Sequence, residues 1–186
     1  MNNNGGVRIK ISTKSARELW NGCTVDYITN VCHGRCCTTG KGEMHVAVLD
    51  DEIPRIEALG GKVVNNMLQP KPGGGCPFQQ ANGFCSLHAS GEKPMTCWLL
   101  PFTLNDNDTL IVKNRNRRLA CYKQPPYQPT YKAYKKALDV MFGEQEAARI
   151  TQRLDAGGGD FYANMPWANY VKIRQIINIT RASYGD

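Results

Sequence analysis

The sequence lacks any long apolar run. No stretch approaches the roughly 18–20 consecutive apolar residues that a membrane-spanning helix requires. The opening segment, MNNNGGVRIKIS, contains no apolar run that could form the core of a secretory signal peptide. These two absences predict a cytoplasmic chain that makes no contact with a membrane.

Common nucleotide-binding and catalytic motifs are also missing. The run Gly73-Gly74-Gly75 is not followed by Gly-Lys-Ser/Thr, and no GxGxxG motif occurs, so no phosphate-binding loop is predicted. No Ser-His-Asp arrangement can be read from the chain, and the catalytic residues stay unknown. No segment repeats at a fixed period, which argues against a solenoid.

Cysteine, in contrast, is abundant, with eight residues in a chain of 186. Three of them form the motif Cys32-x3-Cys36-Cys37, and Cys23 precedes this group. The seven candidate metal ligands are Cys32, Cys36, Cys37, Cys76, Cys85, Cys97 and Cys121. Disulfide scaffolds are usually short because their bridges replace a core, whereas this chain is 41% apolar and long enough to bury one. In a reducing cytoplasm the cluster therefore favours metal binding, with disulfides and inert buried thiols as the alternatives.

The spacing of the cysteines leaves the identity of the metal open. Zinc sites often take ligands as Cys-x2-4-Cys pairs, and Cys32 with Cys36 makes such a pair. The thiols outnumber the ligands of one tetrahedral zinc, so a four-cysteine zinc site, a two-metal site and an iron–sulfur cluster all remain open. His33 and His88 are further candidates, as ligands or as hydrogen-bond donors to sulfur. His45 is expected to be structural.

The net charge of +7 raises the alternative of nucleic-acid binding. The only tight basic run is Lys113-Asn114-Arg115-Asn116-Arg117-Arg118, and no aromatic residues alternate with it to stack bases. A solvated basic loop explains this run more simply. A nucleic-acid-associated module remains a third functional alternative.

The pattern of apolar residues predicts an α+β fold with two parts. Residues 1–122 are expected to form a small, irregular, loop-rich cysteine domain that is stabilised by metal, and residues 123–186 a helical C-terminal extension. Alternation predicts strands over 7–11 and 109–113. Helical spacing predicts helices over 52–59, 144–154 and from 166 onward, and the first of these is expected to be capped by Asp50 or Asp51.

The order of the cysteine motifs is similar to that of the YkgJ-type CxxxCC cysteine-cluster family, whose members are described as zinc- or iron-chelating domains. The matching residues are Cys32, Cys36, Cys37, Asp51, Cys76, Cys85, Pro94, Cys97 and Pro101, with Cys121 resembling a later cysteine of many members. The resemblance covers roughly residues 30–122 and implies metal binding. It departs at Lys93 and Trp98, where family members usually carry arginine.

These observations together predict a metal-binding protein with a structural or assembly role. Its helical extension is expected to pack on the cysteine domain or to dock a protein partner. The alternative is a metal-dependent enzyme that modifies protein or RNA. An open coordination position would favour the enzyme, and a closed all-thiolate site would favour the structural role.

Overall fold

The computed structural model describes residues 5–37 and 46–184. Its fold is α+β, with short strands, small sheets and a C-terminal helix, as the sequence predicts. The chain divides into two compact units, Met1–Gly22 with Trp98–Arg174 and Cys23–Cys97 with Gln175–Asp186. This division differs from the boundary expected after residue 122.

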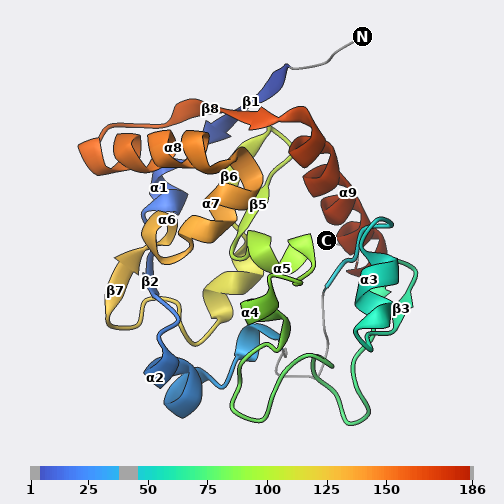
Figure 1. The fold of residues 1–186 in the computed structure, drawn as a ribbon. Helices are drawn as coiled ribbons and strands as arrows, with labels where there is room; N and C mark the ends of the chain where they lie inside the picture. The colour runs from blue at the N-terminus through green and yellow to red at the C-terminus, as the bar shows by residue number, and fades with distance from the viewer. Residues whose placement is uncertain (1–4, 38–45, 185–186) are drawn as a thin grey trace. The chain divides into compact units, whose positions relative to one another are not determined.

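The first unit is built on a four-stranded sheet with the order β5-β6-β1-β8 (Figure 1). Strand β1 (Gly6–Ile11) pairs antiparallel with β8 (Phe161–Pro166) and parallel with β6 (Thr109–Val112). Strand β6 pairs antiparallel with β5 (Phe102–Leu104). The sheet therefore joins the first strand of the chain to its last.

The strand predicted over 7–11 is confirmed by β1. Ile9 and Ile11 have no exposed surface, whereas Arg8 on the opposite face is exposed. Successive side chains of a strand point to opposite faces, so one face of β1 enters the core and the other meets solvent. The strand predicted over 109–113 is likewise confirmed by β6.

The rest of the first unit consists of a two-stranded sheet and several helices. Strands β2 (Leu19–Asn21) and β7 (Tyr127–Pro129) pair antiparallel. The helices are α1 (Thr13–Ala16), η3 (Asn114–Arg118), α6 (Thr130–Ala133), α7 (Lys135–Phe142), α8 (Glu144–Ala156) and the first part of α9 (Trp167–Tyr184). Helices α8 and α9 confirm two of the predicted helices. The C-terminal extension also contains β7 and β8, which the sequence analysis did not assign.

The second unit has shorter and less regular elements. They are α2 (Val25–Tyr27), η1 (Ile28–Cys32), η2 (Arg35–Cys37), α3 (Ile53–Ala58), β3 (Val63–Val64), β4 (Met67–Leu68), α4 (Leu87–Ser90), most of α5 (Met95–Leu99) and the last part of α9. Strands β3 and β4 pair antiparallel. Across the described part of the chain, no helix is both long and apolar enough to span a bilayer.

Helix α3 lies where the sequence predicts a helix, but the predicted cap was wrong. The N-cap residue is Glu52, whose carboxylate accepts hydrogen bonds from the backbone N–H groups of Leu49 (3.1 Å) and Met95 (2.7 Å). Asp50 instead accepts a hydrogen bond from the side-chain amide of Asn66 at 2.6 Å. The Glu52 carboxylate at this end of α3 thus makes a tertiary contact with the first N–H of α5.

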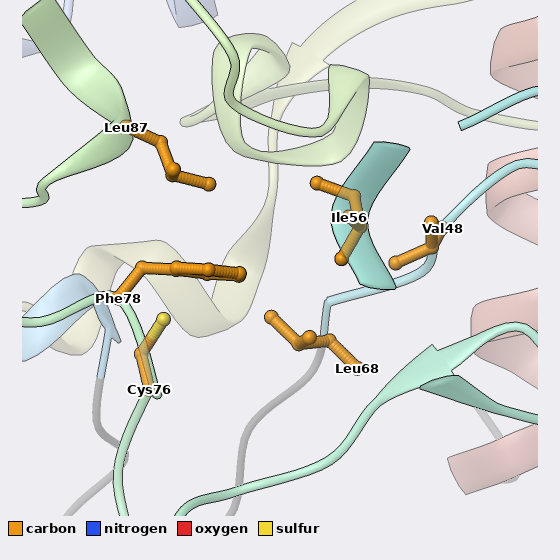
Figure 2. Close-up of a cluster of buried hydrophobic side chains, with 6 residues drawn as sticks. All are labelled: Val48, Ile56, Leu68, Cys76, Phe78 and Leu87. Carbon is orange, nitrogen blue, oxygen red and sulfur yellow. The ribbon is translucent and has the colours of Figure 1, made fainter. Parts of the chain in front are cut away.

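A small apolar cluster forms the core of the second unit. Its buried side chains are Val48, Ile56, Leu68, Cys76, Phe78 and Leu87 (Figure 2). Cys37 and Cys85 are partly buried and pack against this cluster. Three of the seven candidate ligands therefore lie in or on the core of this unit.

Candidate metal centre

The first cysteine group lies on two short helical turns that meet at a left-handed bend. Helix η1 ends at His33, which has φ 47° and ψ 35°, and Gly34 follows with φ 64°. The backbone N–H of Cys37 then donates to the carbonyl of Gly34 at 2.9 Å, within the turn η2. The bend separates buried Cys32 from exposed Cys36.

The second cysteine group is arranged around a tight loop. Backbone hydrogen bonds from Gln80 to Phe84 (2.8 Å) and from Ser86 to Phe78 (2.9 Å) close this loop. Cys76 and Cys85 therefore lie on the two arms of the same turn. Cys97 lies on α5, in the same unit.

Backbone N–H groups point at the sulfur atoms of this second group. The backbone N–H groups of Phe78 and Gln79 help to lower the pKa of Cys76, and that of Leu87 opposes the rise that burial causes at Cys85. Hydrogen bonds of this kind favour the thiolate over the thiol. They are also the contacts that orient and tune cysteine ligands around a metal.

One side chain and a glycine contact join the two cysteine-bearing loops. The side-chain amide of Gln79 donates to the carbonyls of His33 (2.8 Å) and Gly34 (3.2 Å). A Cβ at Gly34 would lie only 2.1 Å from the carbonyl oxygen of Gly83. Because only a hydrogen fits there, the two backbones approach each other directly. Nothing in the sequence pattern singles out Gln79.

Three sulfur atoms form a connected group where these loops meet. The Sγ atoms of Cys36 and Cys37 are 4.0 Å apart, and the Cys37 thiol also hydrogen-bonds Cys76. The ligand sulfurs of a tetrahedral zinc lie about 3.8 Å apart, since each Zn–S bond is about 2.3 Å. The spacing of the Cys36 and Cys37 sulfurs is therefore close to that of two ligands of one ion.

The same hydrogen bonds set the acidity of these thiols. Bonding to Cys36 and then to Cys76 raises the pKa of Cys37. The bond from Cys37 is the main cause that lowers the pKa of Cys36, and it lowers the pKa of Cys76 to about 7. Thiolate is the metal-binding form of cysteine, so both neighbours are prepared to act as ligands.

Cys85 and Cys97 differ from this group because burial is the largest influence on the pKa of each thiol. Burial raises the pKa of each thiol, and the Lys93 ammonium opposes that effect at both positions. Lys93 also helps to lower the pKa of Cys36. Lys93 therefore acts on three cysteines, whereas Lys71 helps to lower the pKa of Cys76. The sequence analysis noted Lys93 only as a departure from the family pattern.

Cys23, which lies outside the motif, is near enough to the cysteine cluster to affect it electrostatically. Cys23 is exposed, yet it interacts electrostatically with Cys36. Among the residues that the structure describes, no three Cys, His, Asp or Glu side chains converge closely enough to hold a metal ion at one point. The donor set thus fits a thiophilic metal by its chemistry and by the spacing of the Cys36 and Cys37 sulfurs, although the described sulfurs do not surround a common centre.

The remaining candidates lie in different surroundings. Cys121 belongs to the first unit, where it is buried with its Sγ 3.7 Å from the hydroxyl of Tyr134. Burial, followed by Lys93, lowers the pKa of His88. His45 lies outside the described residues. No disulfide joins any of the eight cysteines, all of which lie in the described part of the chain.

The basic run over 113–118 is partly occupied by internal contacts. Both Nε and Nη2 of Arg117 donate to the carboxylate of Glu18, the first of them at 2.8 Å. Asn116 is buried, and its side-chain amide donates to the carbonyl of Pro101 at 3.1 Å. These two residues stabilise the first unit.

Comparison with known proteins gives no relative, since no family model, no curated protein and no solved structure matches this chain.

Proposed function

We propose that this chain is a cytoplasmic metal-binding protein whose cysteine cluster holds zinc or an iron–sulfur centre in a structural or assembly role. The main support is the set of backbone N–H groups that donate to Cys76 and Cys85, beside the sulfurs of Cys36 and Cys37. The motif order shared with the CxxxCC cysteine-cluster family also supports metal binding.

The ligands of the proposed site come from separate segments of the second unit. Cys36 and Cys37 would bind from η2, Cys76 and Cys85 from the loop after the glycine run, and Cys97 from α5. Cys32 and Cys121 are further candidates. A metal held by these thiolates would cross-link loops that share only a small apolar core, because ligand bonds formed only in the folded state add to its stability.

An assembly role would use a protein partner, and the C-terminal extension offers aromatic side chains for one. Tyr127, Tyr162 and Trp167 are each at least half exposed. Exposed aromatic residues are common at protein interfaces because they combine apolar area with a polar atom. Three exposed aromatic side chains make only a small surface, so the proposed assembly role is supported mainly by the metal site and less by these residues.

The test is to purify the protein anaerobically and to measure visible absorption together with bound zinc, iron and sulfide. Brown colour with iron and sulfide would identify an iron–sulfur centre, and colourless protein with zinc would identify a zinc site. Cys85→Ser and Cys97→Ser should each lose most of the metal. Cys23→Ser, which changes an exposed cysteine outside the family motif, is the matched control and should keep it. Equal metal content in all three variants, or none in the wild type, would reject the proposal.

A further inference from the structure

The four-stranded sheet of the first unit has two edges of different length. Strand β5 has only three residues and follows Pro101, whereas β8 has six residues. An edge strand presents N–H and C=O groups with which another strand can pair. The longer edge, β8, is therefore the one that invites strand addition.

The register of the sheet shows which groups of β8 face outward. Lys10 lies opposite Tyr162, and the N–H of Lys10 donates at 3.0 Å to the carbonyl of Asp108, on the β6 side. In an antiparallel pair, opposite residues either exchange hydrogen bonds or both face away from each other. Tyr162 and, two residues later, Asn164 therefore direct their backbone N–H and C=O groups to the open edge.

Two side chains of α8 bind these outward groups. The carboxylate Oε1 of Glu146 accepts a hydrogen bond from the N–H of Asn164 at 2.7 Å, and Nη2 of Arg149 donates to the carbonyl of Tyr162 at 3.2 Å. The two side chains are themselves paired at 2.6 and 2.8 Å. One residue of a parallel neighbouring strand would bind the C=O of Tyr162 and the N–H of Asn164. The Glu146–Arg149 pair occupies these same two groups.

Strand β8 carries no charge of its own to discourage pairing. Its sequence, FYANMP, is uncharged throughout. Edge strands commonly avoid association by carrying charged side chains or proline. Here Pro166 blocks only the end of the strand, and the charges at its centre come from α8.

We propose that Glu146 and Arg149 act as an edge guard that prevents β8 from pairing with β8 of a second copy of this chain. A two-fold axis between two copies would place the two strands antiparallel. Because neither strand is charged, the Glu146–Arg149 pair supplies the charge that opposes this pairing at the centre of β8. The proposal does not depend on the metal.

The test measures self-association of the full chain by sedimentation velocity over a concentration series. The double variant Glu146→Ala/Arg149→Ala should associate about tenfold more strongly than the wild type, or more, because strand pairing replaces the lost contacts. The control is Lys135→Ala/Asp139→Ala, which removes an ion pair of similar spacing within α7. That control should associate like the wild type.

A third variant separates strand pairing from exposure of apolar surface. Adding Asn164→Pro to the double variant removes the outward N–H at the centre of the edge, and proline is tolerated on edge strands. Association should return to the wild-type level. The proposal is wrong if the double variant associates no more than the wild type, or if Asn164→Pro leaves its association unchanged.

Hydrogen exchange on the wild-type protein tests the proposal without any variant, so the result does not depend on whether a variant folds. The amide of Asn164 should exchange slowly despite its place on an edge, because Glu146 accepts its hydrogen bond. Exchange of this amide at the rate of an unstructured peptide would show that the guard is not formed and would reject the proposal.

Discussion

Gly34 lies where the first cysteine loop meets the second, with a φ of 64° and the carbonyl of Gly83 directly opposite. Alanine at this position would combine the left-handed backbone penalty of about 1–2 kcal/mol with a clash against backbone. Gly34→Ala should therefore separate the loops, lower the free energy of unfolding by more than that penalty and reduce the metal bound per chain. Urea unfolding and metal analysis measure the two effects.

Gly60→Ala provides a matched control for this prediction. Gly60 also has a positive φ, 92°, but a Cβ added there would meet no heavy atom within 4 Å. This substitution should incur the backbone penalty alone and leave metal content unchanged. If Gly34→Ala behaves like Gly60→Ala, the contact with Gly83 does not position the cysteines.

At this scale the sequence supplies a hypothesis about the chemistry but not the contacts. The order and types of the cysteines predict the candidate ligands, because thiols carry their chemistry wherever they lie, and which of them bind a metal stays a prediction. Gln79 and Lys93 gave no comparable signal, since a glutamine or a lysine becomes informative only when its neighbours in space are known. Cys23 was set apart by its spacing, whereas its interaction with Cys36 depends on the turn between them.

At the scale of elements, the helices with a strong apolar period and the strands β1 and β6 were predicted, whereas β7 and β8 in the C-terminal extension were not. Helix α8 was expected because Ala147, Ile150 and Leu154 repeat at helical spacing, and all three are buried. Strand β8 was not assigned, although Phe161, Ala163 and Met165 alternate into the core. Six residues of alternation are a weak signal until their partner, β1, is known.

The link between α8 and β8 should make stability depend on pH. Hydrogen bonds from Arg149 are the main cause that lowers the pKa of Glu146, and its carboxylate is mostly shielded from solvent. Because the pKa is lowered in the folded protein, the contribution of the carboxylate to the free energy of unfolding is complete above the unfolded pKa of about 4.3. This contribution is lost as pH falls through the folded pKa. Glu146→Gln should therefore destabilise the protein by up to about 1 kcal/mol at pH 7, since Arg149 is half exposed, and by less near pH 3.

The measurement is the free energy of unfolding of wild type and variant at several pH values. Glu144→Gln changes an exposed carboxylate in the same turn of α8 and serves as the control. Its effect should stay small at every pH. A Glu146→Gln effect that is constant from pH 7 to pH 3 would contradict the assigned role of the carboxylate.

The two compact units differ in how much apolar core each contains. The first unit buries many large side chains completely, among them Ile9, Leu110, Met141 and Ile150. The second unit has a cluster of six buried residues and short elements. Removing the proposed metal should therefore open the second unit, while the first keeps its structure.

Limited proteolysis before and after chelation, read by mass spectrometry, checks this prediction. Chelated protein should be cut first within residues 46–97, and the untreated protein should resist cleavage there. Cleavage that begins in the sheet of the first unit, or the same pattern with and without chelator, would show that the metal does not stabilise the cysteine-bearing loops.

At the scale of the whole molecule, composition predicted the fold class but not the division into units. The change of character after Cys121 suggested a boundary, because proline-rich segments often link domains. The strand pairings cross that position instead, joining β1 to β8 and β2 to β7. Pairing between distant segments leaves no trace in composition, so it could not be inferred from one chain.

The pairing of β1 with β8 also limits when the four-stranded sheet can form during synthesis of the chain. The two strands are about 150 residues apart, so at about 5–20 residues per second β1 waits roughly 8–30 s for its antiparallel partner to be synthesised. Every cysteine of the second unit precedes β8 in the chain, and so does β6, the parallel neighbour of β1. The whole proposed metal site is therefore synthesised before the four-stranded sheet can close.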